Sequence, residues 1–263
     1  MMRGRTIPLS AMRRFICDLM YFASQVPSIP VQRRMALGTL AKGRGRLLDR
    51  PPWPAIFAKA FALMADEVPE FRRAYCKFPW PHLYEYPCTV GSVAVEREYR
   101  GEKVVFATRI KDPARAPLAD IAAAIRAAAS DPIDEQRDFR RLLWISNLPR
   151  PIRRLLWWLS LNIGRQRPNY HGTYAVSVYS GLGAESLHPL SPLTATLNYG
   201  VIGSNGAVDV RIIYDHRVLD GATVARGLVR MEELLMTALL DELLAMSASA
   251  SPSDDRRHFE IAG

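Results

Sequence analysis

The 263-residue sequence predicts one α/β domain built on a mixed β-sheet. Two kinds of segment alternate along the chain. In one, apolar residues recur at helical spacing; in the other, apolar and polar residues alternate, as in strands. No linker or internal repeat separates them, and no glycine-rich phosphate loop follows a predicted strand. The apolar content of 49% is enough for a buried core in a chain of this length.

The N-terminal part is predicted to contain two helices. The first spans residues 11–24, where Ser10 is a plausible N-cap and apolar residues recur at helical spacing. Residues 26–40 are predicted to be extended, and residues 41–52 to form a basic, glycine-containing loop. The second helix spans residues 53–65, with its apolar residues on one face.

The middle of the chain predicts a loop, a strand pair and a helix. Residues 76–88 are rich in aromatic residues and proline, which is typical of a loop. Two strands, at residues 90–95 and 103–110, flank a turn at Arg100, Gly101 and Glu102. An alanine-rich helix follows over residues 117–130.

Three strands, one helix and a tail are predicted for the C-terminal part. The strands cover residues 173–179, 193–199 and 207–214. The helix spans about 222–244 and completes a domain of residues 1–245. Residues 246–263 are rich in serine, alanine and charged residues, which predicts a disordered tail.

Residues 137–168 combine pairs of arginine with leucine and tryptophan, and Pro149 and Pro151 must break the segment in two. Three interpretations stay open for residues 142–163. A basic, tryptophan-rich segment is typical of peripheral contact with a membrane surface. The same residues could line a tunnel for a long acyl chain, or simply pack on the core or in a subunit interface.

The charge pattern favours an anionic partner. The net charge is +9, and residues 1–50 hold ten Lys or Arg against Asp18 and Asp49, while residues 137–167 hold eight Arg against Asp138. No nucleic-acid-binding motif is present, so a phosphate-bearing molecule, an acidic protein or a membrane surface is favoured over nucleic acid.

Cysteine content and hydropathy point to the compartment. The three cysteines, Cys17, Cys76 and Cys88, lack the paired spacing of a zinc site or disulfide framework. We therefore expect no metal and a reducing, cytoplasmic environment, with peripheral contact to the inner face of a membrane as an option. No run of about 18 apolar residues predicts a transmembrane helix.

The segment from Tyr214 to Gly221 carries the clearest chemistry. His216 lies in the predicted turn between a strand and a helix, where an imidazole can be held rigidly and take a proton from a thiol or hydroxyl. Asp220 could cap the helix, balance an arginine or orient the turn, and Gly221 permits a backbone that a Cβ would hinder. From spacing alone, a lone histidine in such a turn is more often structural than catalytic, so the structural alternative stays open at this point.

The eight residues from Asp215 to Ala222 resemble the DHRxxDG motif of the catalytic domain of 2-oxo acid dehydrogenase acyltransferases, the dihydrolipoyl transacylases. Further similarities follow in the family's order over residues 5–245. They include Ile7–Arg14, Phe57–Leu63 with Val68–Glu70, Gly91–Val95 with Thr108–Asp112, and Gly172–Ser177. The resemblance implies a chloramphenicol acetyltransferase-like fold, a two-layer sandwich of a mixed sheet and flanking helices.

The resemblance also implies roles for individual residues. His216 would be the general base, and the Ser177 hydroxyl would hydrogen-bond the tetrahedral oxyanion. Asp220 would keep the geometry of the site, supported by Gly221 and by Arg13 as an ion-pair partner. Family members are trimers or larger shells of trimers with the site between subunits, so a homotrimer is expected, with His216 and Ser177 coming from neighbouring chains.

Departures from the family pattern bear on the substrate. The chain has no room for a lipoyl domain, so we expect an acyl-CoA or acyl carrier protein as donor, bound as a substrate, with an acyl-lipoyl thioester as a further option and no permanently bound cofactor. Residues 178–181 differ from the family's Asn-Leu-Gly, which predicts a reshaped oxyanion region. Two alternatives stay open: a non-catalytic oligomeric scaffold, and a lipid-directed O-acyltransferase at a membrane surface.

Overall fold

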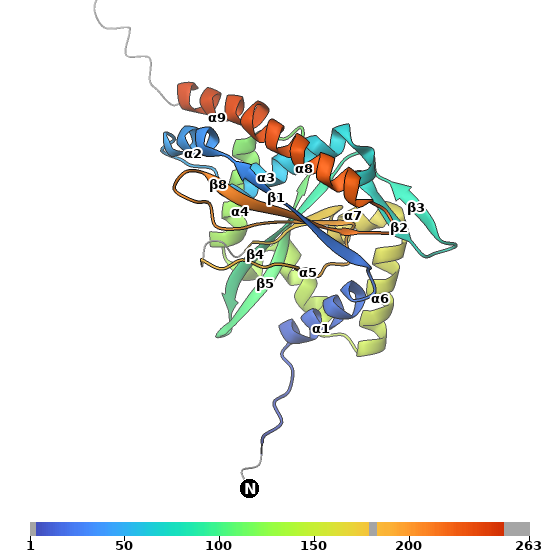
Figure 1. The fold of residues 1–263 in the computed structure, drawn as a ribbon. Coiled ribbons are helices and arrows are strands. Elements are labelled where there is room, and N and C mark those ends of the chain that lie inside the picture. The colour runs from blue at the N-terminus through green and yellow to red at the C-terminus, as the bar shows by residue number, and fades with distance from the viewer. Residues whose placement is uncertain (1–3, 179–182, 250–263) are drawn as a thin grey trace, which may run out of the picture.

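The computed structural model describes residues 4–178 and 183–249, and Figure 1 shows its arrangement. The helices and strands, with 3-10 turns as η, follow in chain order: α1 (Ala11–Ala23), β1 (Ser28–Ala36), α2 (Gly38–Gly45), α3 (Trp53–Glu67), η1 (Pro69–Arg72), β2 (Arg73–Cys76), β3 (His82–Glu85), β4 (Val90–Tyr99), β5 (Glu102–Lys111), α4 (Leu118–Ser130), η2 (Ile133–Glu135), α5 (Arg137–Ser146), α6 (Arg150–Asn162), η3 (Gly164–Gln166), α7 (Arg167–His171), β6 (Tyr174–Val176), β7 (Ala195–Tyr199), β8 (Ala207–Asp215), α8 (Gly221–Met236) and α9 (Ala238–Ser249).

Six strands form a mixed sheet in the order β1-β8-β7-β6-β4-β5. β6 runs parallel to both β4 and β7, and the other neighbours are antiparallel. The α/β class and the mixed sheet predicted from the sequence are confirmed. β2 and β3 form a separate antiparallel pair at the side of the molecule.

One face of the sheet carries the main core, because α3 and α8 pack side by side on it, α3 against β4 and β6 and α8 against β1 and β8. Phe57 and Phe61 of α3 stack on Tyr199 and Tyr174 of the sheet, with ring centres 4.1 and 4.2 Å apart. The predicted alternation in β8 is also confirmed. Its inward residues Val208, Val210, Ile212 and Tyr214 all belong to this core.

The predicted helices over residues 11–24, 53–65 and 117–130 correspond to α1, α3 and α4. The Ser10 side chain caps α1, because its Oγ accepts a hydrogen bond from the backbone N–H of Arg13 at 3.1 Å. The hairpin of β4 and β5 turns at Arg100 and Gly101, which both have positive φ, as a tight turn requires.

Three local predictions were wrong. Residues 38–45 form α2, where the end of an extended segment (to residue 40) and the start of a loop (from residue 41) were expected, because buried Leu40 adds packing energy that glycine-rich composition does not reveal. The loop expected over residues 76–88 contains β3, which pairs with β2 in an antiparallel hairpin. The single helix expected over 222–244 is two helices, α8 and α9, divided at Thr237, whose φ and ψ of −118° and −90° are not helical.

The predicted C-terminal tail begins too early. α9 continues to Ser249, so residues 246–249 are helical, while residues 250–263 lie outside the described part of the chain. Residue 179, the end of the strand predicted over 173–179, also lies outside the described part of the chain. The same holds for residues 179–181 of the expected oxyanion region.

The segment of residues 137–168 folds into α5 and α6, divided near Pro149 as predicted, and Figure 1 shows both beside α1 at one end of the sheet. Trp157 is buried at 4% exposure, whereas Trp144 is 61% exposed, so the segment contributes to the core and also leaves apolar side chains at the surface. Within residues 4–178 and 183–249, no helix combines the length and apolar character needed to cross a bilayer.

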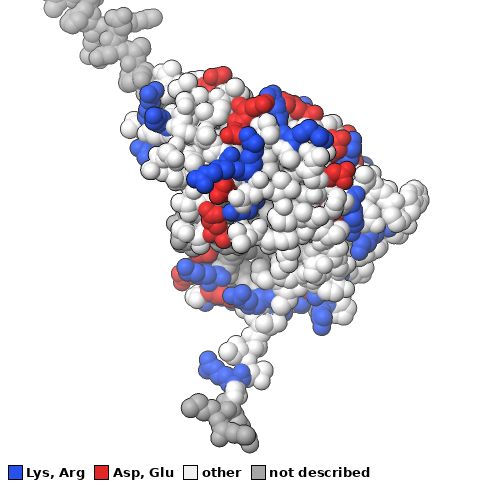
Figure 2. Space-filling view, viewed as in Figure 1, with Lys and Arg blue, Asp and Glu red and all other residues white. Residues whose placement is uncertain are grey.

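Several arginines of this segment are structural and not part of a free basic surface. Arg153 and Arg154 both pair with buried Asp18 of α1, and buried Arg167 donates to backbone carbonyls, including that of Pro192. Figure 2 shows positive and negative side chains interleaved over the upper part of one face of the molecule. Part of the positive charge clustered in the sequence is therefore engaged in ion pairs and hydrogen bonds within the fold.

Candidate active site

The turn that follows β8 is held by a buried ion pair. Asp215 is 3% exposed, and its two carboxylate oxygens accept hydrogen bonds from Nε and Nη2 of Arg217 at 2.9 and 2.7 Å. The guanidinium of Arg217 also lies 4.3 Å from the centre of the Tyr75 ring. This bidentate arrangement fixes the backbone on both sides of His216.

His216 projects from this turn with a defined tautomer. Its Nδ1 lies 3.0 Å from the carbonyl oxygen of Leu219, which only accepts, so Nδ1 carries the proton. The backbone N–H of His216 donates to the carbonyl of Pro27 at 3.0 Å, which ties the turn to the chain leading into β1. In the neutral ring Nε2 therefore presents a lone pair, and the side chain is 45% exposed. These are the properties that a general base requires.

Asp220 and Gly221 connect the turn to α8. An Asp220 carboxylate oxygen lies 3.8 Å from Nδ1 of His216, and the side chain is 85% exposed. Asp220 occupies the N-cap position of α8, but its side chain makes no capping hydrogen bond. Burial and the charge of Asp220 raise the pKa of Tyr214. A Cβ at Gly221 would stand 3.3 Å from the Tyr214 hydroxyl, so this glycine permits close packing.

Arg13 does not join this group within one chain. It lies at the start of α1 and pairs with Glu102 at 3.4 Å. Glu102 begins β5, which is four strand spacings from β8 in the sheet, or about 19 Å at about 4.8 Å per spacing. The ion pair expected between Arg13 and Asp220 is therefore not formed within a single subunit.

Ser177 follows β6 at the other end of the sheet. The register places it level with Asn198 of β7, which pairs with Arg211 of β8, five residues before His216. At about 3.3 Å per residue, the two predicted catalytic residues are roughly 16 Å apart along the strand direction. One chain does not bring His216 and Ser177 together.

Neighbours hold Ser177 in place. Its N–H donates to the carbonyl of Leu197 at 3.1 Å, and its own carbonyl accepts from Nδ2 of Asn198 at 2.5 Å. Asn198 is fully buried, and its Oδ1 has no hydrogen-bond partner among the described residues. Sequence reasoning did not identify Asn198, because an asparagine inside a strand carries no distinguishing pattern.

Two further features near the site were also missed. His188 Nε2 lies 2.9 Å from the hydroxyl of Ser28, and Ser28 pairs with Asp215 in the sheet, so this histidine is close to the turn that carries His216. The stacking of Arg217 on Tyr75 joins residues that are distant in sequence. The sequence motif included Arg217, but nothing in the sequence indicated that Tyr75 would be its aromatic partner.

Comparison with known proteins identifies the fold. No protein-family model and no curated protein sequence matches the chain. Among solved structures, a probable dihydrolipoamide acetyltransferase from Listeria monocytogenes has a TM-score of 0.63 at 16% identity, over 95% of this chain and 97% of that one. The dihydrolipoamide acetyltransferase of Azotobacter vinelandii scores 0.64 at 15% identity, over 90% and 93%.

A third similar structure is chloramphenicol acetyltransferase, with a TM-score of 0.50 at 15% identity over 87% of this chain and 96% of that one. These similarities span nearly the whole length of the proteins compared, and they confirm the architecture expected from the motif. The chain has the chloramphenicol acetyltransferase-like fold of dihydrolipoamide acetyltransferase catalytic cores.

Proposed function

We propose that this protein is an acyltransferase that moves an acyl group from a thioester to a thiol, hydroxyl or amine acceptor. The observation that carries the proposal is the hydrogen bond from Nδ1 of His216 to the Leu219 carbonyl, which leaves Nε2 as an exposed base on a rigid turn. A fold shared with acetyltransferase cores supports the same reaction class.

In the proposed mechanism, Nε2 of His216 takes the proton of the acceptor as the acceptor atom attacks the thioester carbonyl carbon. The carbonyl oxygen becomes an oxyanion, which receives a hydrogen bond from the Ser177 hydroxyl, a type of interaction worth about 3 kcal/mol in the transition state. The carbon–sulfur bond then breaks, and the departing thiolate takes the proton from His216. Charge and protons balance over the two steps.

Asp220 is proposed to keep His216 in place. The mechanism of the Azotobacter vinelandii protein is described with a serine, a histidine and an asparagine, and that asparagine follows the histidine by four residues. Asp220 follows His216 by the same interval and lies 3.8 Å from its ring. A positioning role for the residue four places after the histidine is therefore part of the proposal.

The proposed assembly is a homotrimer with the active site between subunits. The roughly 16 Å between Ser177 and His216 in one chain supports this arrangement, because a second copy could bring the two side chains together. Similar structures include the cubic core of a pyruvate dehydrogenase multienzyme complex and a catalytic core from Thermoplasma acidophilum, both described as parts of larger assemblies. The proposed donor is an acyl-CoA or an acyl carrier protein, with an acyl-lipoyl thioester as the alternative.

The direct test is release of free thiol from a panel of acyl-CoAs, offered with thiol, alcohol and amine acceptors. We expect His216→Ala to lower turnover by 10²- to 10⁴-fold, because it removes the base, and Ser177→Ala by about 10²-fold. His82→Ala, which changes a histidine on the β3 hairpin, is the matched control and should retain full turnover.

The opposite result is equally clear. If wild type and His216→Ala release thiol at the same rate with every donor and acceptor, while both keep the same oligomeric state, the protein is not this enzyme. The non-catalytic scaffold would then be the better description.

A further inference from the structure

A large cavity lies outside the proposed active site, among α1, α5, α6, α7 and the edge strand β5. Its volume of about 460 Å³ is within the range of small-molecule binding sites. Most of its walls come from residues 137–171, and residues 137–168 show no resemblance to the acyltransferase motifs. The proposed acyl transfer uses none of these residues.

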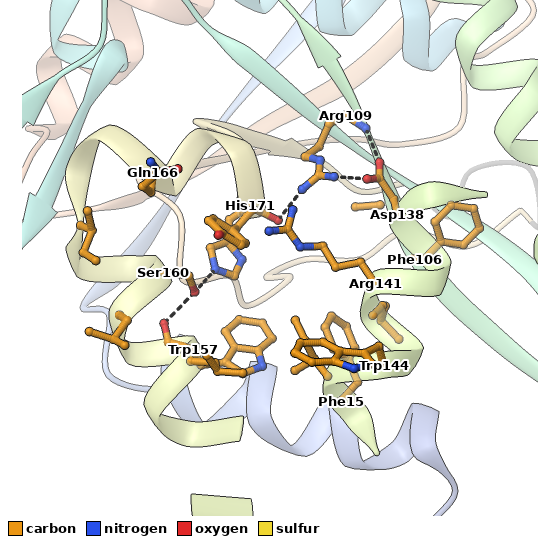
Figure 3. Close-up of a pocket in the computed structure, with 17 residues that line it drawn as sticks. Phe15, Phe106, Arg109, Asp138, Arg141, Trp144, Trp157, Ser160, Gln166 and His171 are labelled. Atoms are coloured by element: carbon orange, nitrogen blue, oxygen red, sulfur yellow. Dashed lines mark hydrogen bonds and ion pairs between the residues drawn. The ribbon is translucent and has the colours of Figure 1, made fainter. Parts of the chain in front are cut away.

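The cavity has one apolar and one polar side. Figure 3 shows Phe15, Trp144 and Trp157 on one side, and Arg109 and Arg141 on the other. Leucine and isoleucine side chains of α5 and α6 complete the apolar wall. This division matches a ligand that is apolar along most of its length and polar at one end.

The polar end carries an uncompensated positive charge. Arg109 pairs with Asp138, so these two charges cancel. The guanidinium of Arg141 lies 3.8 Å from the centre of the Tyr170 ring and donates to the carbonyl of Asn169 at 3.2 Å. In the described part of the chain, no carboxylate is within 4.0 Å of the Arg141 guanidinium. Arg141 thus keeps its charge and donors for an anion.

The other polar groups at this end are neutral. Burial, together with the charges of Arg167, Arg109 and Arg141, lowers the pKa of His171 to about 3, so the imidazole is uncharged at neutral pH. Its Nε2 lies 2.8 Å from the hydroxyl of Ser160. One unit of positive charge therefore remains among the charged residues that line the cavity.

The cavity is open to solvent beside apolar side chains. Trp144, Ile163 and Tyr170 line it and are 61%, 42% and 39% exposed. Large exposed apolar side chains around a cavity indicate a binding surface more than ordinary exterior. An aliphatic chain entering here would remain in contact with apolar groups along its path.

We propose that this cavity binds a single aliphatic chain with an anionic head group, a carboxylate or a phosphate, whose head lies on Arg141 and whose chain lies against Trp144 and Trp157. The site is separate from His216 and does not depend on the acyl transfer proposed above. Its ligand is a bound amphiphile, and no covalent step is involved.

Isothermal titration of the purified protein with dodecanoic acid, dodecyl phosphate and 1-dodecanol tests the proposal. We expect both anions to bind, and each methylene removed from the chain to weaken binding by about fourfold. The neutral alcohol should bind more weakly than either anion, by about tenfold or more, because it cannot use the charge of Arg141. The anion that binds more tightly, the carboxylate or the phosphate, identifies the head group that the site prefers.

Variants separate the head site from the chain site. Arg141→Gln should weaken both anions by at least about tenfold and leave 1-dodecanol unchanged. Trp144→Ala, at an exposed position, should weaken all three ligands. Arg150→Gln is the control, because it removes an exposed arginine of α6 that does not line the cavity.

Two results would overturn the proposal. The first is a failure of all three ligands to bind a folded protein, with Trp144→Ala changing only its oligomeric state, which would make the cavity part of a contact between copies. The second is capture of the protein by anionic phospholipid vesicles, lost in Trp144→Ala, without binding of any soluble amphiphile, which would make this face a membrane contact.

Discussion

The surroundings of two histidines, His216 and His171, suit them to different roles. His216 is partly exposed, and its Nδ1 is held by the Leu219 carbonyl, so Nε2 is available as a base. His171 is partly buried beside Arg109, Arg141 and Arg167, and burial together with these positive charges lowers its pKa to about 3. A ring that resists protonation so strongly is suited to a neutral structural or ligand-binding role, and not to proton transfer at neutral pH.

The lowered pKa of His171 predicts a loss of stability in acid. An unfolded histidine binds a proton as the pH falls through about 6.5, while the folded ring stays neutral down to about pH 3. Between these values the unfolded state holds more protons, so the free energy of unfolding decreases as the pH falls. From pH 7 to pH 5 this residue should account for a loss of about 2 kcal/mol.

Urea unfolding of wild type and His171→Asn at the two pH values measures this contribution. The variant lacks the titrating group, so its stability should fall less than that of wild type by about 2 kcal/mol. Equal pH dependence in the two proteins would show that His171 is protonated in the folded state. The comparison uses the difference between proteins, so other groups that titrate in this range cancel.

At the scale of elements, the contact between α1 and α6 depends on one carboxylate. Asp18 is 1% exposed, accepts a hydrogen bond from Nε of Arg153 at 2.6 Å, and pairs with Arg154 at 2.8 Å. The Arg154 guanidinium also lies 3.6 Å from the Tyr21 ring. Phe22 of α1 and Trp157 of α6 stack beside this group, with ring centres 5.7 Å apart.

We expect Asp18→Asn to lower the free energy of unfolding by about 3–5 kcal/mol, because it leaves two arginines without their counter-charge, one of them buried. Urea denaturation gives the value directly. Asp134→Asn removes an exposed carboxylate and should change stability by no more than about 0.5 kcal/mol. Similar small losses in both variants would mean that solvent reaches the Asp18 site.

At the scale of the whole molecule, the sheet separates the two residues on which the proposed chemistry depends. β6 and β8 present Ser177 and His216 at opposite ends, roughly 16 Å apart. In the proposed assembly, each subunit would therefore contribute two half-sites. In a ring of identical subunits, each interface would join the His216 of one copy to the Ser177 of the next.

This arrangement predicts complementation between inactive variants. His216→Ala and Ser177→Ala should each be nearly inactive alone, but a co-assembled mixture should regain activity, since a subunit with intact His216 can face one with intact Ser177. With random co-assembly of equal amounts, about a quarter of the interfaces are intact, which sets the expected recovery. Thiol release after joint refolding measures it, and a mixture no more active than its components would place both residues in one subunit's site or outside any site.

The sequence predicted those elements whose local pattern and tertiary environment agree. α1, α3, α4 and the hairpin of β4 and β5 follow from apolar spacing, the Ser10 cap and the turn at Arg100 and Gly101, because each pattern reflects the buried face of its own element. The motif from Asp215 to Gly221 likewise located the turn that carries His216.

Contacts between distant segments were decided only by the tertiary structure. α2 is helical although it is rich in glycine, because Leu40 is buried in the core, and Arg13 pairs with Glu102 instead of Asp220, because α1 starts at the far edge of the sheet. The spacing of residues along one element is a local property that sequence records directly. The tautomer of His216, the distance to Ser177 and the cavity beside Arg141 depend on which elements become neighbours, and packing of the whole chain determines that.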